Sequence, residues 1–391
     1  MAARRLRHLR LTSVPKHYAE KHRLQISDLP SYTGFELVLL GTGAGMPSIH
    51  RGASSVCVQL PRKSWLVDCG EGSLRQLFRS TVRVTTTEKI FLTHVHGDHL
   101  FGLPGLLCTL NALNVGYVAP NAKEISRRPI DIYAPRGVFD FVNTALIVSA
   151  ANMSNVIVTV HELVHPTDIM SRPTIPRQVH ECLRHTFIQP QKIDDNLHWK
   201  LVDDGEHTVM AGMLNHSVPC FGYVMEENEI KGRLDADAVQ RRGLPPGPLY
   251  RLLKEGTSVE LPDGTLLHPH EVTGPSRRGR KVAILGDSCD SSAMFPLARN
   301  VDVLVHEATL DQSKEATAIE RGHSTSSMAG RFARSMNATL LVLTHFSHRF
   351  SPAPTSTRSV QQLVEEARKT FGKRAVVDAF DLMRIRIPPH H

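Results

Sequence analysis

The sequence lacks the closely spaced cysteine pairs of a disulfide framework. Its cysteines are scattered along 391 residues without a C-x-x-C pair: Cys57, Cys69, Cys108, Cys182, Cys220 and Cys289. This spacing indicates a protein of a reducing compartment that folds without disulfide bonds. The hydrophobic content of 41% is enough for a sizeable core, in one large α/β domain or in two smaller ones.

The sequence also lacks a secretory signal and a membrane span. The longest run without charge, residues 100–122, is interrupted by glycine, proline and asparagine, which favours a buried helix followed by a loop. Residues 1–14 are rich in arginine and leucine and contain no acidic residue, so they resemble a mitochondrial presequence. A disordered basic tail has the same composition. The compartment therefore stays open between mitochondrion, cytoplasm and nucleus.

Net positive charge is small outside the N-terminus. The net charge is +8, but residues 1–30 contain seven basic and two acidic residues, which account for five of these charges. The high pI is therefore weak evidence for nucleic-acid binding, and any RNA contact must come from local patches. We expect residues 1–34 to form a basic extension ahead of a folded domain over residues 35–388.

No nucleotide-cofactor fingerprint is present, although a glycine-rich loop follows the first predicted strand, 35–40. The loop Gly41–Gly45 lacks the third glycine of a dinucleotide site and the lysine of a P-loop. A predicted hairpin, 56–60 with 64–67, then leads to Asp68-Cys69-Gly70-Glu71-Gly72 and a helix over 73–78. The two carboxylates of this turn can support metal ligands or cap the helix.

What the sequence does contain is a dense metal-ligand motif after the predicted strand 89–92. Between residues 94 and 99 it places His94, His96, Asp98 and His99. In an extended H-x-H segment both rings point the same way and can bind one cation, whereas the two residues beyond Gly97 can serve a second cation or a bound water. Neutral imidazole with carboxylate suits Zn²⁺, with Mn²⁺ and Fe²⁺ as alternatives.

Later predicted strands also end in histidine or aspartate: 208–214 precedes His216, 282–285 precedes Asp287, 301–305 precedes His306 and Glu307, and 339–343 precedes His345. Each of these residues alone would more often be a cap or a core residue. Together they predict two cation sites that share Asp287. One site would use His94, His96, His216 and Asp287, and the other Asp98, His99, Asp287 and His345.

Two segments do not fit this pattern. Residues 161–206 are polar and suggest no chemistry, so their histidines (His161, His165, His180, His185 and His198) are predicted to lie on the surface or in loops. Between residues 226 and 281 the sequence has ten basic and nine acidic residues and few large apolar ones. This composition predicts an arm that projects from the domain.

The order His-x-His-x-Asp-His, followed by His, Asp and His, resembles the metallo-β-lactamase superfamily. Within it, residues 90–107 are similar to ribonuclease Z, the tRNA 3′-processing endonuclease, almost residue for residue. The resemblance continues in Leu40–Gly43, Asp68–Gly72, Arg75–Leu77, Pro246–Tyr250, Gly286–Ser288, His306–Thr309, Gly322–Thr325 and Leu343–Ser347. It spans residues 35–388, with divergent loops near 118–130 and 161–206. Ser288 departs from the usual threonine but keeps the hydroxyl.

The resemblance implies an α/β fold, the four-layer αββα sandwich with two mixed sheets and a protruding flexible arm. Residues 228–280 would be the tRNA-binding arm. The length resembles the short form, in which homodimers use the arm of one subunit to hold tRNA cleaved by the other. The implied enzyme is a hydrolase with two Zn²⁺ per subunit. It removes the 3′ trailer from precursor tRNA, leaving a tRNA 3′-hydroxyl and a 5′-phosphorylated trailer.

The resemblance also implies roles for single residues. Asp98 would accept the proton of the attacking water, and His306, oriented by Glu307, would protonate the departing 3′-oxygen. His323 would contact phosphate or support the site. In the arm, the predicted tRNA contacts are Gly247, Pro248, Arg241, Arg242, Arg251 and Lys254. Two alternatives remain: a hydrolase of small phosphodiesters or sulfate esters with the same two-metal site, and an RNA-binding protein without metal.

Overall fold

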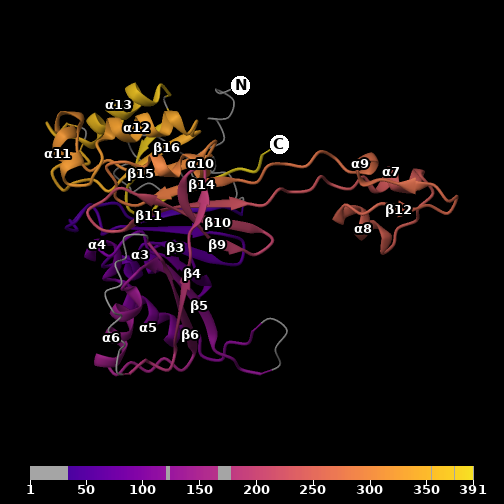
Figure 1. Cartoon of the computed structure of the whole chain (residues 1–391), viewed down its shortest axis with the longest axis horizontal. Coiled ribbons are helices and arrows are strands. Elements are labelled where there is room, and N and C mark those ends of the chain that lie inside the picture. Colours follow the sequence, from indigo (N-terminus) through magenta and orange to yellow (C-terminus); the bar gives the residue numbers. More distant parts are fainter. Residues whose placement is uncertain (1–33, 120–123, 166–177, 354, 374, 391) are drawn as a thin grey trace.

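Two eight-stranded sheets form the centre of the computed structural model, which describes residues 34–119, 124–165, 178–353, 355–373 and 375–390 (Figure 1). The first sheet has the order β18 (Met383–Arg386), β1 (Glu36–Gly41), β2 (Ser55–Gln59), β3 (Ser64–Val67), β4 (Thr87–Phe91), β5 (Arg128–Pro135), β6 (Val156–Leu163) and β7 (Leu183–Ile188). The second has the order β17 (Val376–Asp378), β16 (Leu340–Thr344), β15 (Val303–Glu307), β14 (Lys281–Leu285), β11 (Cys220–Glu227), β10 (His207–Leu214), β9 (Asn196–Asp203) and β8 (Gln191–Ile193). Both sheets combine parallel and antiparallel pairs.

Alternation along the strands separates two apolar layers. Leu37 and Leu39 of β1 belong to the core between the sheets, whereas Val38 and Leu40 belong to the core under the helices of the first sheet. Successive side chains of a strand point to opposite faces, so a strand covered on both sides is apolar throughout. The central core is rich in aromatic side chains: Trp65, Phe91, Tyr133, Trp199, Phe221 and Tyr223.

Helices cover the outer face of each sheet. On the first sheet these are α3 (Ser73–Arg79), α5 (Leu103–Leu113) and α6 (Val138–Val148), and on the second α10 (Phe295–Ala298), α12 (Ser326–Ser335) and α13 (Val360–Phe371). The predicted four-layer sandwich with two mixed sheets is therefore confirmed. Short elements complete the body: η2 (Val84–Thr86), α4 (Gly97–Leu100), η3 (Ser292–Met294), η4 (Gln312–Lys314) and α11 (Glu315–Glu320). Within the described ranges, no helix is long and apolar enough to cross a membrane.

The prediction that residues 161–206 form loops is partly wrong, because the structure places β7, β8 and β9 in this segment. His198 on β9 is fully buried, and its Nε2 lies 3.0 Å from the carbonyl oxygen of Ala293. His165 is also buried. The polar composition concealed these strands, since most residues of β7 and β8 are exposed and so need not be apolar.

A long excursion leaves the body after β11 and returns at β14 (Figure 1). Its tip holds α7 (Ala236–Arg241), α8 (Leu249–Glu255), β12 (Val259–Glu260), β13 (Leu266–Leu267) and α9 (Pro269–Val272). We call residues 228–280 the arm. Its tip has a small core of its own, formed by Leu234, Val239, Leu244, Leu253, Val259, Leu261, Leu267 and Val272. The division of the chain at residue 34 stays a prediction, because residues 1–33, including the presequence-like segment, lie outside the described part.

Candidate metal centre

The His-rich motif forms a tight turn between β4 and α4. His96 has extended backbone (φ −63°, ψ 148°) and precedes α4, whose first turn contains Asp98 and His99. A Cβ atom at Gly97 would lie 2.4 Å from the Phe101 ring, so any other residue at this position would require that exposed ring to move. The ligands before Gly97 thus come from an extended segment and those after it from a helical turn, and both sets reach the same centre.

The first ligand group joins the end of β4 to the end of β10. His94 Nε2 lies 3.1 Å from His96 Nδ1, which lies 3.3 Å from His216 Nε2. His216 is 120 residues from His96 along the chain, yet the three side chains form one possible metal-binding group. The structure thus brings together the three histidines that the sequence assigned to the first cation.

The second ligand group joins α4 to the end of β16. His345 Nε2 lies 3.2 Å from His99 Nε2 and 3.3 Å from Asp98 Oδ2. The same three residues form a second possible metal-binding group. Three of the four residues predicted for the second cation are therefore adjacent.

Asp287, at the end of β14, lies between the two groups. Its Oδ2 is 3.7 Å from His94 Nε2, and its Oδ1 is 3.7 Å from His99 Nε2 and 3.4 Å from His345 Nδ1. The carboxylate is almost completely buried. It can therefore offer one oxygen to each group, as expected for a bridging ligand.

The donor atoms fit a tetrahedral cation such as Zn²⁺. Zn–N bonds of about 2.0–2.1 Å place two nitrogens of a tetrahedron roughly 3.3 Å apart. The nitrogen pairs of the two groups are separated by 3.1 to 3.3 Å. Burial and the neighbouring imidazoles of His99, His216, His96 and His345 lower the pKa of His94 far below its usual value. This ring is therefore neutral, which is the form that binds a metal.

Outer partners hold the ligand rings in place. Asp68 Oδ2 lies 2.7 Å from His99 Nδ1, while its Oδ1 accepts a 2.8 Å hydrogen bond from the backbone N–H of Thr93. His216 Nδ1 lies 2.7 Å from the carbonyl oxygen of Gly322. Such contacts fix the tautomer and the orientation of a ligating imidazole. Asp68 thus has the supporting position that the sequence suggested, whereas Glu71 of the same turn is exposed.

His306 does not reach this centre, and its predicted pairing with the side chain of Glu307 is wrong. The two residues are neighbours on β15, so their side chains point to opposite faces. His306 is buried against Phe332 of α12, with 5.6 Å between ring centroids, and its Nδ1 lies 2.9 Å from the backbone oxygen of Glu307. The carboxylate of Glu307 faces the metal centre instead.

The partner of Glu307 is His323. Their Oε1 and Nδ1 atoms are 3.2 Å apart, and His323 Nδ1 is also 3.8 Å from Asp287 Oδ2. Burial opposes ionisation of both groups, but their hydrogen bond and mutual charge dominate. They raise the pKa of His323 and lower the pKa of Glu307, so the pair is ionised at neutral pH. In the sequence, nothing indicates this contact except that each of the two residues lies in a motif of the family.

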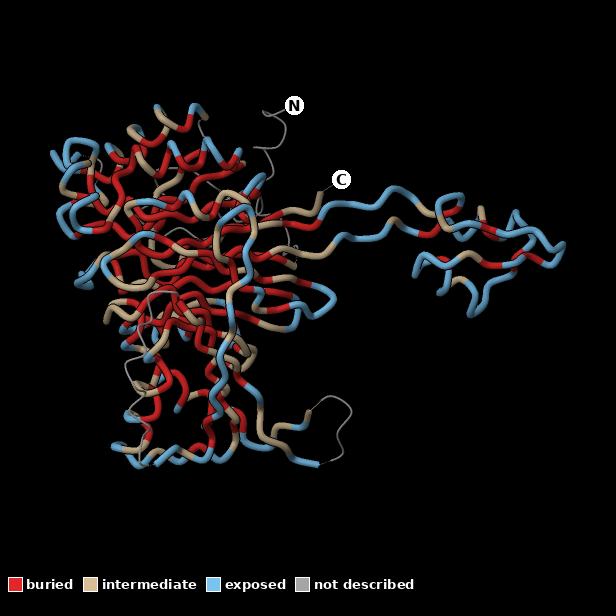
Figure 2. Tube along the Cα trace, viewed as in Figure 1, coloured by how far each residue is buried: buried red, intermediate tan, exposed pale blue. Residues whose placement is uncertain are grey.

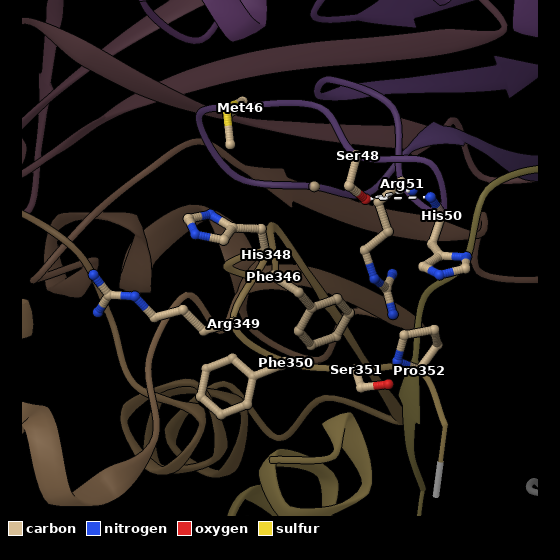
Figure 3. Close-up of a pocket in the computed structure, with 11 residues that line it drawn as sticks. Met46, Ser48, His50, Arg51, Phe346, His348, Arg349, Phe350, Ser351 and Pro352 are labelled. Atoms are coloured by element: carbon tan, nitrogen blue, oxygen red, sulfur yellow. Dashed lines mark hydrogen bonds between the residues drawn. The ribbon is translucent and has the colours of Figure 1, made fainter. Parts of the chain in front are cut away.

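A cleft of about 210 Å³ lies between the loop after β1 and the segment that follows His345 (Figure 3). One wall is formed by the loop that comes after β1 and includes His50 and Arg51. The other is formed by the segment that comes after the ligand His345 and includes Phe346 and Arg349. The guanidinium of Arg51 lies 4.4 Å from the centre of the Phe346 ring. The backbone N–H of Gly45, in the same loop as Arg51, donates a 2.7 Å hydrogen bond to Asp98 Oδ2. The cleft is thus lined by cationic and aromatic side chains, and one of its walls belongs to the loop that binds the predicted ligand Asp98.

The predicted arm contacts lie apart from the metal centre, at the tip of the arm (Figure 1). Gly247 and Pro248 directly precede α8, and Lys254 lies in its last turn. Arg241 is at the end of α7, where its guanidinium is 3.9 Å from Asp235, and Arg242 forms an ion pair with Glu271. Among the described residues these side chains do not contribute to the metal-binding groups.

Known proteins resemble this chain over most of its length. Mouse zinc phosphodiesterase ELAC protein 1 is 38% identical over 367 residues, which cover 90% of this chain and 98% of the relative. Ribonuclease Z of Gloeothece citriformis is 34% identical over 357 residues, covering 91% and 97%. The family model of the anti-Pycsar protein Apyc1 matches residues 35–112.

Solved structures agree with the sequence comparison. The crystal structure of human tRNase Z, short form (ELAC1), superposes with a TM-score of 0.60 and 31% identity, covering 90% of this chain and 99% of that one. The metallo-β-lactamase fold protein YhfI of Bacillus subtilis shares the fold, with a TM-score of 0.53 and 18% identity over 90% of this chain and 98% of that one. The fold is thus of the metallo-β-lactamase type, and the chain belongs to the ribonuclease Z family, as its motifs predicted.

Proposed function

We propose that this chain is a zinc-dependent endoribonuclease that removes the 3′ trailer from precursor tRNA. The products would be a tRNA with a 3′-hydroxyl and a trailer with a 5′-phosphate. The observation that carries this proposal is the pair of ligand groups, each partly or fully buried, that share the buried Asp287 in a chain of the ribonuclease Z family.

The donor set supports two cations per subunit. His94, His96 and His216 would hold one and Asp98, His99 and His345 the other, with Asp287 between them. We favour Zn²⁺ because imidazole donors dominate and the mouse relative is named a zinc phosphodiesterase, with Mn²⁺ and Fe²⁺ as alternatives. Two such ions, when bound, lower the pKa of water and stabilise charge on a phosphoryl group.

Asp98 is the proposed proton acceptor for the attacking water. Its Oδ2 atom is held by the backbone N–H of Gly45 at 2.7 Å and lies 3.3 Å from His345 Nε2. These contacts fix the carboxylate within the second ligand group. A fixed carboxylate can take up a proton without first having to change its rotamer.

His323 is the proposed proton donor to the departing 3′-oxygen, with Glu307 as its orienting partner. Glu307 holds the Nδ1 side of the ring and raises the pKa of His323, so the imidazolium is available at neutral pH. The ring of His323 lies 5.1 Å from that of His216 and 5.8 Å from that of His345. It therefore adjoins both ligand groups, whereas His306 lies on the other face of β15.

The arm is the proposed binding site for the body of the tRNA. Gly247 and Pro248 would allow close approach of an RNA backbone, while Arg241, Arg242 and Lys254 would neutralise phosphates regardless of sequence. The distance of the tip from the metal centre of the same chain favours a homodimer in which the tip serves the tRNA cleaved by the partner subunit (Figure 1). The cleft between the loop after β1 and the segment after His345 would receive nucleotides that flank the scissile phosphate.

The test is cleavage of a precursor tRNA that carries a 3′ trailer, with product ends resolved at single nucleotides. Wild-type protein should cut after the discriminator base in a metal-dependent way, and Asp98→Ala should not cut. If the intact, metal-loaded protein leaves the precursor uncut but hydrolyses a small phosphodiester or a sulfate ester, the tRNA assignment fails and the small-substrate alternative takes its place.

A further inference from the structure

The arm leaves the body as an antiparallel ribbon with little support along its length. Backbone hydrogen bonds connect Ile230 with Arg277 in both directions, and Gly274 donates to Arg233. Most residues of this ribbon are exposed, as the pale tube between body and tip shows (Figure 2). A two-stranded ribbon without a packed face does not determine its own direction relative to the body. The direction of the arm must therefore be set where the ribbon meets the body.

At that root, Arg280 and Glu227 form a buried ion pair across the two strands. Arg280 Nε donates to Glu227 Oε2 at 2.6 Å, Nη2 donates to Oε1, and the backbone N–H of Glu227 donates to the carbonyl of Arg280 at 2.9 Å. The side chain of Arg280 is 6% exposed and that of Glu227 12%, in contrast to the exposed ribbon. A bidentate pair of this kind fixes orientation as well as distance.

Arg280 also connects this pair to both ends of the folded body. Its Nη1 donates to the carbonyl oxygen of Ile387 at 2.9 Å, and its guanidinium lies 5.3 Å from the centre of the Phe35 ring. Phe35 immediately precedes β1, and Ile387 immediately follows β18. Both residues are fully buried. The guanidinium therefore attaches the arm to the edge of the first sheet, although the arm strands continue from the second.

Two further contacts restrict the returning strand of the arm, which contains Arg280. A Cβ atom at Gly279 would lie 1.8 Å from the carbonyl oxygen of Glu227, so the strands approach more closely than a side chain allows. Arg278 Nη2 donates to Asp302 Oδ1 at 2.9 Å, and His390 Nε2 lies 3.1 Å from Asp302 Oδ2. The C-terminal segment 387–390 therefore packs against the returning arm strand.

We infer that Glu227, Arg280 and the C-terminal segment 387–390 form a clamp that sets the direction of the arm and so positions the tRNA relative to a metal centre. This inference rests on the proposed function of the arm. A small rotation at the root displaces the tip by an amount proportional to the length of the ribbon. The clamp residues touch neither the metal-binding groups nor the tip, so they are positioning residues.

The clamp is tested with Arg280→Ala, the conservative variant Arg280→Lys and the control Arg277→Ala. Arg277 lies on the same strand, is exposed, and makes no side-chain hydrogen bond or ion pair within the described residues. Arg280→Ala should raise the KM for precursor tRNA by about tenfold or more, with kcat/KM for bis(p-nitrophenyl) phosphate unchanged. Arg280→Lys should restore part of the loss, and Arg277→Ala should change the KM by less than about threefold.

The direction of the arm is measured separately with two spin labels. One label is placed on the exposed native Cys108 and the other on Thr257→Cys at the tip, in a Cys289→Ser background. Distances are measured by pulsed electron paramagnetic resonance. The wild-type background should give a narrow distribution that Arg280→Ala broadens and Arg277→Ala leaves narrow. Because removing one partner leaves the other charge buried, the double variant Glu227→Gln with Arg280→Gln repeats the test without an unpaired charge.

The outcomes separate the clamp from the function of the arm. An unchanged distance distribution in both Arg280→Ala and the double variant overturns the clamp, whatever happens to the KM. A broadened distribution with an unchanged KM for precursor tRNA overturns the positioning role. If the wild-type protein does not cleave precursor tRNA, the proposed function fails, and the distance measurement still decides whether the clamp holds the arm.

Discussion

The metal centre and the arm differ in what holds their functional groups in place. In the centre, the ligands are buried or partly buried, and outer partners such as Asp68 and Gly322 fix the rings of His99 and His216. In the arm, charged side chains are exposed on a tip that is supported mainly by its own small core. Chemistry on a phosphate requires groups placed within a fraction of an ångström, whereas recognition of a large polyanion requires reach and charge. The following predictions separate these two requirements.

The largest effect is expected when the shared ligand is removed. Asp287→Ala takes a carboxylate from both ligand groups and leaves their histidines close together without it. We expect kcat to fall on the order of 10³-fold or more for precursor tRNA and for bis(p-nitrophenyl) phosphate alike. Metal content, measured by mass spectrometry on the purified protein, should fall in parallel. Full metal content with normal turnover would show that Asp287 is not a ligand.

Removing the arm should affect only the large substrate. Residues 228–279 can be replaced by Asn-Gly, because Glu227 and Arg280 already pair as the last residues of a hairpin. Cleavage of precursor tRNA should fall by at least about 10²-fold through loss of phosphate contacts, while turnover of bis(p-nitrophenyl) phosphate and metal content stay unchanged. Equal losses on both substrates would mean that the arm supports the metal centre rather than the tRNA.

His323 and His306 provide a matched pair inside the body. His323→Ala should lower kcat for precursor tRNA by about 10²-fold or more, because the 3′-oxygen is a poor leaving group that needs a proton. The loss should be smaller for bis(p-nitrophenyl) phosphate, since nitrophenolate departs without protonation. His306→Ala should leave kcat unchanged and lower the free energy of unfolding by about 1–3 kcal/mol, through its buried contact with Phe332. The reverse result, loss of kcat in His306→Ala alone, would reinstate the original assignment.

The comparison of these two histidines also shows what a sequence can reveal. The ligands could be predicted because each follows an apolar strand, and ends of parallel strands meet at one edge of a sheet. The partner of Glu307 could not, because it lies 16 residues further along the chain and its contact depends on which face of β15 each side chain occupies. Strands β7 to β9 and the core of the arm tip were missed because composition alone conceals short apolar patterns within polar segments.

The Glu307–His323 pair predicts a pH effect that distinguishes it from a purely structural contact. Glu307 raises the pKa of His323, so the acid form persists to higher pH in the wild-type protein than it would without this carboxylate. Activity on precursor tRNA should be lost as pH rises through the pKa of His323. In Glu307→Gln this loss should occur at lower pH, as measured by kcat–pH profiles. Coincident alkaline limbs in the two proteins would contradict the role of Glu307.

The smallest effect is expected for a single charge at the arm tip. Lys254, in the last turn of α8, is exposed, so its replacement should leave the fold intact. Lys254→Ala should weaken binding of precursor tRNA by about twofold to fivefold and reduce the slope of log Kd against log salt concentration by about one. Lys254→Arg should preserve both values because it keeps the charge. A loss of affinity without a change in salt slope would indicate that Lys254 acts through packing of the tip. The difference between the arm and the metal centre would then not be explained by the charge of the arm.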